Sequence, residues 1–206
     1  MKNLETEGVY EPENYPEETD EQVFQAYLSD LNLSPDDLEK KMLDVGSGYA
    51  QFAKWAKDHS ISEKIFSLDS KGRFIETSKS VIANAKAIPF ADNSFELVIS
   101  NSSMPQVLLN KDATQMQVDV HRVFEELLRV SVQTGEIRLG NVILGGKEDV
   151  RVQMTSIVQQ ELERIKREYD AEVEVIRKGD VHRYEGHTPI EVVAGRYLII
   201  IRKHKK

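Results

Sequence analysis

Cysteine is absent from this 206-residue chain. Its absence excludes disulfide bonds, thiolate metal sites and cysteine nucleophiles, and it fits a reducing compartment. Long hydrophobic runs are also absent, since the longest covers only residues 197–201. A bilayer span needs about 20 apolar residues, and residues 1–20 lack the charged and then apolar pattern of a secretion signal. We therefore expect a cytoplasmic protein with no membrane association.

Positive charge is scarce relative to negative charge. The chain has 27 lysines and arginines against 35 aspartates and glutamates, which gives a formal net charge of -8. This balance disfavours a protein-wide attraction to nucleic acid or to anionic lipid. A nucleic-acid partner is therefore not expected, although the basic residues 202–206 leave a local contact open.

Internal repeats, low-complexity tracts and interdomain linkers are missing as well, so the chain length predicts one well-cored domain. Residues 1–18 differ from the rest because they are rich in glutamate and contain Pro12 and Pro16. This composition predicts a flexible acidic arm. We expect the arm over residues 1–18 and a single domain over residues 19–206.

Strand-like and helix-like segments alternate along most of the domain. Strands are expected over residues 41–46, 64–68, 81–83, 96–100, 136–144, 171–177 and 196–202. Helices are expected from Thr19, from Pro35, and over residues 51–59, 72–79, 113–130 and 154–169. This alternation predicts an α/β fold with a doubly wound, mostly parallel seven-stranded sheet and helices on both faces. The last two strands lack an intervening helix, which predicts an antiparallel C-terminal edge hairpin.

The most informative stretch is Asp44-Val45-Gly46-Ser47-Gly48, which follows an apolar strand and precedes a helix. In open α/β sheets such a turn lies at the carboxyl end of its strand, where ligands bind. Gly46 and Gly48 have no Cβ atom, so the backbone can turn sharply and approach a ligand closely. By itself, the pattern is equally typical of a strand-to-helix turn that binds nothing.

Two further features agree with a nucleoside ligand. Asp69 ends the next apolar strand, where a carboxylate can accept hydrogen bonds from both ribose hydroxyls. Residues 84–95 then form a second motif, which leads into the strand over residues 96–100. A dinucleotide-binding motif would need a third glycine where Gln51 stands, so that alternative is disfavoured.

Together, the segments DVGSG (residues 44–48) and IPFADNSFELVIS (residues 88–100) resemble motifs of the class I S-adenosylmethionine-dependent methyltransferases. The similarity is greatest to the small, methyltransferase type 11-like branch of that family. It covers about residues 41–144 and implies a Rossmann-like fold with S-adenosylmethionine as the cofactor.

The resemblance also implies a role for each matching position. The glycine turn would hold the methionine portion of the cofactor, the acid after the second strand its ribose, and the segment after the third strand its adenine. The end of the fourth strand would face the methyl-transfer site. The implied cofactor-binding residues are Asp44, Gly46, Ser47, Gly48, Asp69, Ser70, Asn84, Ala85, Ser100 and Asn101.

Three positions depart from the family pattern. Ala50 stands where many relatives have a third glycine, Asn84 where aspartate is usual, and Glu96 where aspartate is frequent. The side-chain oxygen of Asn84 can still accept a hydrogen bond from an adenine amino group. The departures weaken the predicted binding site without removing any of its parts.

The expected activity is methyl transfer to an acceptor, and a small molecule is favoured because the chain is short, acidic and without an evident docking domain. Alignment of the two reactants can carry much of this reaction, so no catalytic triad is required. Residues 104–110 follow the fourth strand and are expected to wall the acceptor pocket.

No residue pattern assigns a catalytic group or a metal site. By residue type, His121, His182 and His187 are the candidates for a general base. Two alternative functions stay open. One is a protein that binds S-adenosylmethionine without catalysis, and the other is a methyltransferase that acts on RNA or protein.

Overall fold

The computed structural model of the chain describes residues 18–72, 79–110, 112–146, 148–185 and 188–204. The acidic arm expected over residues 1–18 and the short helix expected over residues 72–79 lie almost entirely outside these ranges, and both stay predictions.

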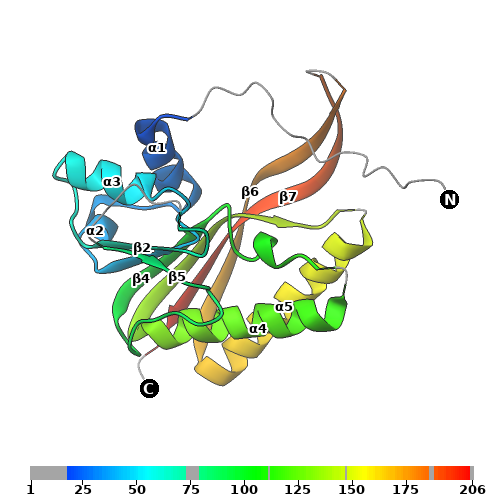
Figure 1. Ribbon diagram of the computed structural model, residues 1–206. Helices are drawn as coiled ribbons and strands as arrows, with labels where there is room; N and C mark the ends of the chain where they lie inside the picture. Colours follow the sequence, from blue (N-terminus) through cyan, green and yellow to red (C-terminus); the bar gives the residue numbers. More distant parts are fainter. Residues whose placement is uncertain (1–17, 73–78, 111, 147, 186–187, 205–206) are drawn as a thin grey trace.

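The described residues form a seven-stranded sheet with the order β3-β2-β1-β4-β5-β7-β6 (Figure 1). Its strands are β1 Met42–Val45, β2 Ile65–Asp69, β3 Ser80–Ile82, β4 Phe95–Asn101, β5 Ser131–Leu144, β6 Ala171–Glu185 and β7 Thr188–Lys203. Neighbouring strands pair in parallel through β3, β2, β1, β4 and β5. Strand β7 pairs antiparallel with both β5 and β6. The predicted doubly wound α/β fold with an antiparallel C-terminal edge hairpin is therefore confirmed.

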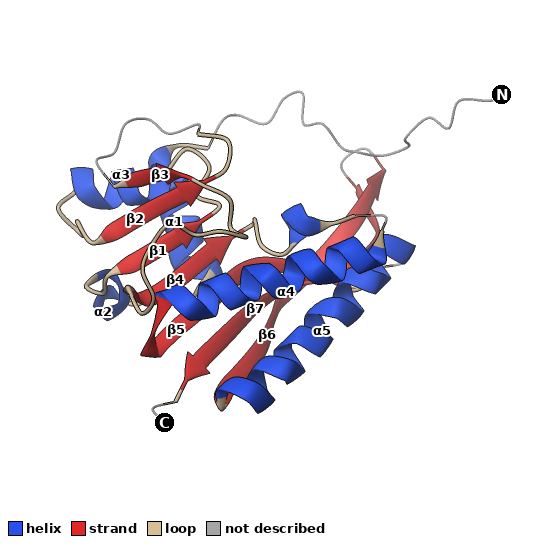
Figure 2. Cartoon of the chain, turned by 60° about the horizontal axis from the view of Figure 1, so that its bottom comes forward, coloured by secondary structure: helices blue, strands red, loops and turns tan. Residues whose placement is uncertain are grey.

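Helices cover both faces of this sheet (Figure 2). They are α1 Asp20–Asp30, α2 Pro35–Leu38, α3 Gln51–Asp58, the 3₁₀ helix η1 Gln106–Leu108, α4 Ala113–Val130 and α5 Asp149–Tyr169. Along β1 the side chains alternate, because Leu43 and Val45 join the core beneath α4 and α5 while Met42 joins the core beneath α1 and α3. The two cores fix the sheet between two helical layers. Among the described helices, none has the length and apolar character needed to cross a bilayer.

The helix starts follow the signals in the sequence. Thr19 caps α1 and Ser34 caps α2, each through a reciprocal capping box with the third helical residue. The Asp112 carboxylate caps α4 by accepting the backbone N–H groups of Thr114 and Gln115. These caps satisfy donors that would otherwise be unpaired, so the helices begin where the sequence predicts them.

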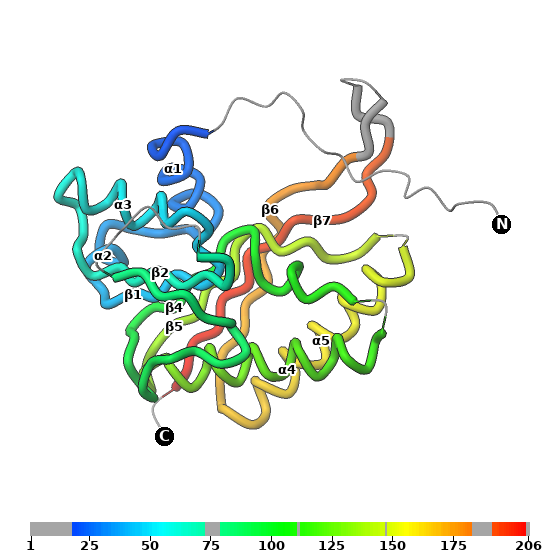
Figure 3. The backbone as a smooth tube through the Cα atoms, in the orientation of Figure 1, coloured from blue at the N-terminus to red at the C-terminus, as the bar shows by residue number. Residues whose placement is uncertain are grey.

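The hairpin of β6 and β7 is much longer than the sequence predicts. Strand β7 pairs with β5 only from Gly195 onward, and its residues 188–194 pair with β6 alone. The two strands run side by side through this extension (Figure 3). The predicted strands, which end at residue 177 and begin again at residue 196, do not include this extension.

Candidate functional site

A cleft of about 640 Å³ opens at the carboxyl ends of β1, β2, β3 and β4. Parallel strands place all of these ends at one edge of the sheet, and the volume lies within the usual range for ligand pockets. The lining residues are Gly46, Gly48, Leu68, Asp69, Ser70, Lys71, Ala83, Asn84, Ala85, Lys86, Ser103, Met104, Val107, Leu108, Leu109, Asn110 and Asp119.

The glycine turn forms one wall of the cleft. Its backbone has a conformation that residues other than glycine adopt with difficulty. Gly46 and Gly48 have φ angles of 79° and 57°, in the left-handed region that glycine tolerates. A Cβ atom on Gly46 would lie 2.1 Å from the Ser103 Oγ, so close packing also requires glycine there. Beside Gly48 no atom lies within 4 Å of such a Cβ position, so this part of the turn is open for a ligand.

Asp69 lies directly against this turn. One oxygen of its carboxylate accepts the Gly48 N–H at 3.2 Å, and the other accepts the Lys71 N–H at 2.7 Å. A carboxylate has about four lone-pair positions, so both oxygens can accept further hydrogen bonds from a ligand in the cleft. Two motifs that are 21 residues apart in the sequence therefore meet at one point.

Asp44 lies beneath the turn and is completely buried. Within the described part of the chain, neither of its carboxylate oxygens has a hydrogen-bond partner. Burial raises the pKa of Asp44 to about 8; the nearby Tyr27 hydroxyl lowers this pKa in part, and the Asp69 charge raises it further. Asp44 is therefore mostly protonated at neutral pH, and no described residue pairs with its carboxyl oxygens.

Two serine hydroxyls close to Asp44 are also buried without a hydrogen-bond partner among the described residues. Ser67 lies opposite Asp44 on β2, and Ser47 belongs to the glycine turn. Buried polar groups normally find a partner, so a cluster of unpaired ones beneath a cleft is typical of a site that a ligand or ordered water completes.

The predicted adenine segment also lines the cleft. Ser70 and Asn84 are exposed there, while Ala85 is buried against the core. The Asn84 Oδ1 atom accepts the Lys86 N–H at 2.9 Å, which holds the segment in a tight turn. Its second lone pair remains available for an amino group.

Of the predicted cofactor-binding residues, Asp44, Ser47, Ser100 and Asn101 do not line the cleft. The Ser100 Oγ accepts the Met104 N–H at 3.2 Å, and Asn101 donates from Nδ2 to Asp30 of α1 at 3.1 Å. These contacts shape the loop after β4, whereas direct contact with a cofactor stays a prediction for all four residues.

Several cleft residues escaped the sequence analysis. Ser103 lies only three residues beyond the recognised motif, so extending that motif along the loop would have found it. Asp119 comes from α4 and forms an ion pair with Lys86 at 3.1 Å. No local signal marks Asp119, because the packing of α4 on the sheet brings it to the cleft.

Neither His121 nor His182, two of the candidate general bases, lines the cleft. His121 faces α5, where its Nδ1 atom is 3.3 Å from Glu161, and His182 lies on β6. His187 is outside the described residues. Ligand atoms of His121, Glu125 and Glu161 lie within 4.8 Å of one another, which a metal ion would require. Arg164 already bonds to both glutamates, so the guanidinium takes the place that a cation would need.

The fold is a Rossmann-like α/β domain, and its cleft lies at the edge of the sheet where such domains bind their ligands. The model of the methyltransferase domain family matches residues 43–139, which contain both recognised motifs. No curated protein matches the chain in sequence.

Solved structures share the fold at low sequence identity. The YcgJ protein of Bacillus subtilis is 13% identical with a TM-score of 0.55, and the match covers 82% of this chain and 94% of that one. A protein bound to the Trm112 methyltransferase activator of Haloferax volcanii is 14% identical with a TM-score of 0.55, covering 89% and 93%.

A proposed methyltransferase of antibiotic biosynthesis from Anabaena variabilis is 12% identical with a TM-score of 0.50. The match covers 76% of this chain, which spans only 64% of that longer protein. The family match therefore agrees with the class that the motifs predicted over residues 43–139, and the solved structures agree with the predicted fold.

Proposed function

We propose that the protein transfers a methyl group from S-adenosylmethionine to a small-molecule acceptor bound in the cleft. One observation carries this proposal: the Asp69 carboxylate meets the open glycine turn, and that turn follows the strand that carries the buried, unpaired Asp44. A ligand with vicinal hydroxyls and a positive charge would complete both features. S-adenosylmethionine has a ribose, a sulfonium and an ammonium group, so the residues present fit it.

The residues of the cleft would divide the binding between them. Asp44, Gly46, Ser47 and Gly48 would hold the methionine portion, and Asp69 with Ser70 would hold the ribose. Asn84 and Ala85 would contact the adenine, while Ser100 and Asn101 would position the loop beside the reacting methyl group. This division follows the family resemblance, and the cleft supports it for the lining residues.

Bound S-adenosylmethionine supplies an electrophilic methyl group, whose bond to sulfur breaks as the bond to the acceptor forms, leaving a neutral thioether. The protein contributes orientation, because the rigid glycine turn and the loop after β4 hold two walls of the cleft in fixed relation. No histidine lines the cleft among the described residues. We infer that the proton of the acceptor leaves to water or to Asp119, which lines the cleft.

The acceptor is proposed to be small because the cleft of about 640 Å³ has the volume of a small-ligand pocket and the chain is acidic overall. A single domain over residues 19–206 preceded by an acidic arm, and a cytoplasmic location suggested by the absence of cysteine, belong to the same proposal.

Calorimetry with S-adenosylmethionine and with its demethylated product tests the cofactor site. We expect micromolar or tighter binding of both, followed by labelled methyl transfer to at least one compound in an acceptor screen. Failure to bind either nucleoside would reject the proposed function. Binding without transfer to any acceptor would favour a non-catalytic role, and transfer to RNA or protein alone would reject the small-molecule acceptor.

A further inference from the structure

The wall of the cleft that follows β4 is apolar. It is formed by the loop after β4 together with η1, and its lining residues beyond Ser103 are Met104, Val107, Leu108, Leu109 and Asn110. Four of these five side chains are hydrophobic, and residues 104–110 include no charged residue. A ligand that lies against this wall therefore meets hydrocarbon rather than charge.

Two of the apolar side chains on this wall are exposed. Val107 and Leu109 are 61% and 36% exposed, although both are large and hydrophobic. Among the exposed side chains of this kind in the described residues, only these two line the cleft. Exposed apolar groups beside a cleft are typical of a ligand-contacting surface.

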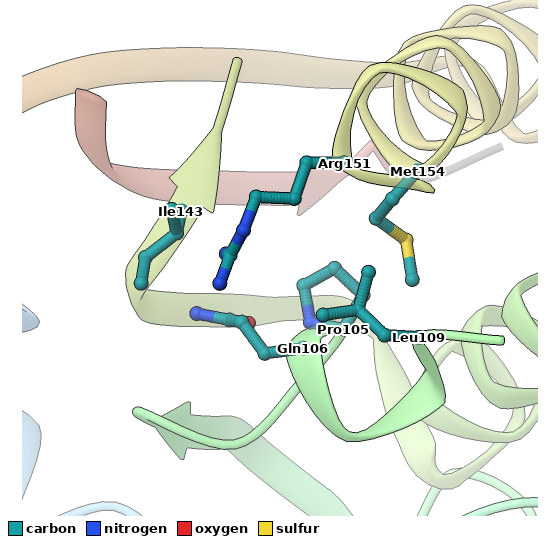
Figure 4. A pocket seen from close by; sticks show the side chains of 6 residues that line it. All are labelled: Pro105, Gln106, Leu109, Ile143, Arg151 and Met154. Atoms are coloured by element: carbon teal, nitrogen blue, oxygen red, sulfur yellow. The ribbon is translucent and has the colours of Figure 1, made fainter. Parts of the chain in front are cut away.

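Packing on the other side of η1 holds the wall in place. Figure 4 shows Pro105, Gln106 and Leu109 extending from η1 and its ends toward β5 and α5. Gln106 Nε2 donates to the Asn141 carbonyl of β5 at 2.5 Å, which ties η1 to the sheet. The space left between these elements is only about 10 Å³, room for no more than one water molecule. Its lining residues are Pro105, Gln106, Leu109, Ile143, Arg151 and Met154.

The charged residues of the cleft lie elsewhere in its lining. Lys86 and Asp119 pair with each other at 3.1 Å, and the Asp119 carboxylate also accepts the Gln115 side-chain amide at 3.0 Å. Asp69 and Lys71, the other charged lining residues among those described, lie at the end of β2 that is proposed to hold the ribose. A charged group against the apolar wall would lose its hydration without gaining a counter-charge there.

We propose that the methyl acceptor is an uncharged molecule with an apolar body and one hydroxyl or thiol group. This inference rests on the proposed methyltransferase function. The body lies along Val107, Leu108 and Leu109, where burial of its apolar surface stabilises the complex. The methyl group leaves the sulfonium and bonds to the oxygen or sulfur of the acceptor, so the sulfonium becomes a thioether. The proton of the acceptor leaves to water or to Asp119.

Three phenols of similar shape test this assignment on protein saturated with S-adenosylhomocysteine. In 4-propylphenol the end away from the hydroxyl is uncharged, whereas 4-hydroxyphenylacetate carries a carboxylate there and tyramine carries an ammonium group. Calorimetry should show that 4-propylphenol binds at least about tenfold more tightly than either charged phenol. Equal affinities, tighter binding of a charged phenol, or no binding of any of the three would each overturn the assignment.

Val107→Lys places a cation on the apolar wall at an exposed position. In this variant the affinity ratio should shift by at least about tenfold from 4-propylphenol toward 4-hydroxyphenylacetate. Val192→Lys is the matched control, because Val192 is 49% exposed on β7 and does not line the cleft. It should keep the ratio of the parent. An unchanged ratio in V107K, or an equal shift in V192K, would overturn the assignment. Failure of the unaltered protein to bind S-adenosylhomocysteine would instead reject the proposed function.

Discussion

The two halves of the sheet differ in how fully their buried polar side chains are hydrogen-bonded. From β1 to η1, buried side-chain atoms without partners occur at Asp44, Ser47, Ser67, Asn101 and Gln106. In the described residues from Asp112 onward, no such atom is present. Buried polar groups in the described C-terminal half therefore have hydrogen-bond partners within the chain. Those around the cleft lack such partners, and we infer that a ligand supplies them.

The C-terminal half shows what completed pairing looks like. Arg164 bonds to Glu125, Glu161 and Glu168, and Tyr169 donates its hydroxyl to Glu125. These bonds join α4 to α5 over one core. Polar groups in this region therefore stabilise the packing of α4 on α5. Substitutions there should affect stability without affecting ligand binding.

Replacing Asp69 with alanine is expected to have the largest effect on the cleft. The variant loses the acceptor for the ribose hydroxyls and the bond that steadies Gly48, so affinity for S-adenosylmethionine should fall by about 2 kcal/mol or more. Calorimetry measures the change. Asp58→Ala is the control, because Asp58 lies on α3 and pairs only with Lys54 among the described residues. An unchanged affinity in the Asp69 variant would show that the unpaired groups of this half do not mark a nucleoside site.

Replacing Asp44 with asparagine should separate binding from stability. The neutral amide cannot attract a cationic ligand, so affinity should fall by about 1–2 kcal/mol. The same change removes a buried charge without a partner, so the ligand-free variant should unfold at a higher temperature than the parent above pH 8. Calorimetry measures the affinity and thermal unfolding measures the stability. If the variant lost stability as well as affinity, a role of Asp44 in binding the ligand would be contradicted.

The pH dependence of the parent follows from the raised pKa of Asp44, about 8 in the folded protein. The unfolded chain releases this proton near pH 4, so stability declines as pH rises from about 4 through about 8. A cationic ligand favours the ionised carboxylate, so its affinity should increase as pH rises toward 8 and then level off. The asparagine variant should lack both slopes, and a flat affinity profile in the parent would refute the assignment.

Replacing Arg164 with methionine tests the other half of the comparison. The change leaves Glu161, which is 7% exposed, with only His121 as a partner among the described residues, so the free energy of unfolding should fall by about 1–2 kcal/mol. Affinity for S-adenosylmethionine should not change. Arg167→Met, on the exposed side of the same helix, should alter neither quantity. A loss of nucleoside affinity in the Arg164 variant would remove the distinction between the two halves.

Sequence reasoning was most successful where a local signal governs the structure. The start and end of α4, the start of α1 at Thr19 and the alternation of strands and helices all follow from capping residues and apolar periodicity. The meeting of Asp69 with the glycine turn also follows, because parallel strands place both segments at one edge.

What the sequence could not predict depends on packing between distant segments. Asp119 and Arg151 reach their cavities from helices whose own periodicity indicates only a buried face and an exposed face. Asn101 turns toward Asp30 because α1 lies there, a contact across 71 residues of chain. The extended hairpin escaped prediction for a related reason, because residues 188–194 of β7 pair with β6 alone and no local signal marks that pairing.

Replacing Ala50 with glycine should have the smallest effect. It tests whether a residue next to the glycine turn, but outside the cleft lining, influences binding. Ala50 precedes α3 with a φ of 58°, the left-handed conformation that glycine adopts freely. Relief of that conformation is worth about 1–2 kcal/mol. Loss of a buried methyl group and the greater freedom of the unfolded chain offset it by about the same amount. Unfolding should therefore shift by less than about 1 kcal/mol, and S-adenosylmethionine affinity should not change, because Ala50 does not line the cleft. A clear gain in affinity would instead mean that the alanine obstructs the site, and would favour a protein that has lost part of its ancestral binding.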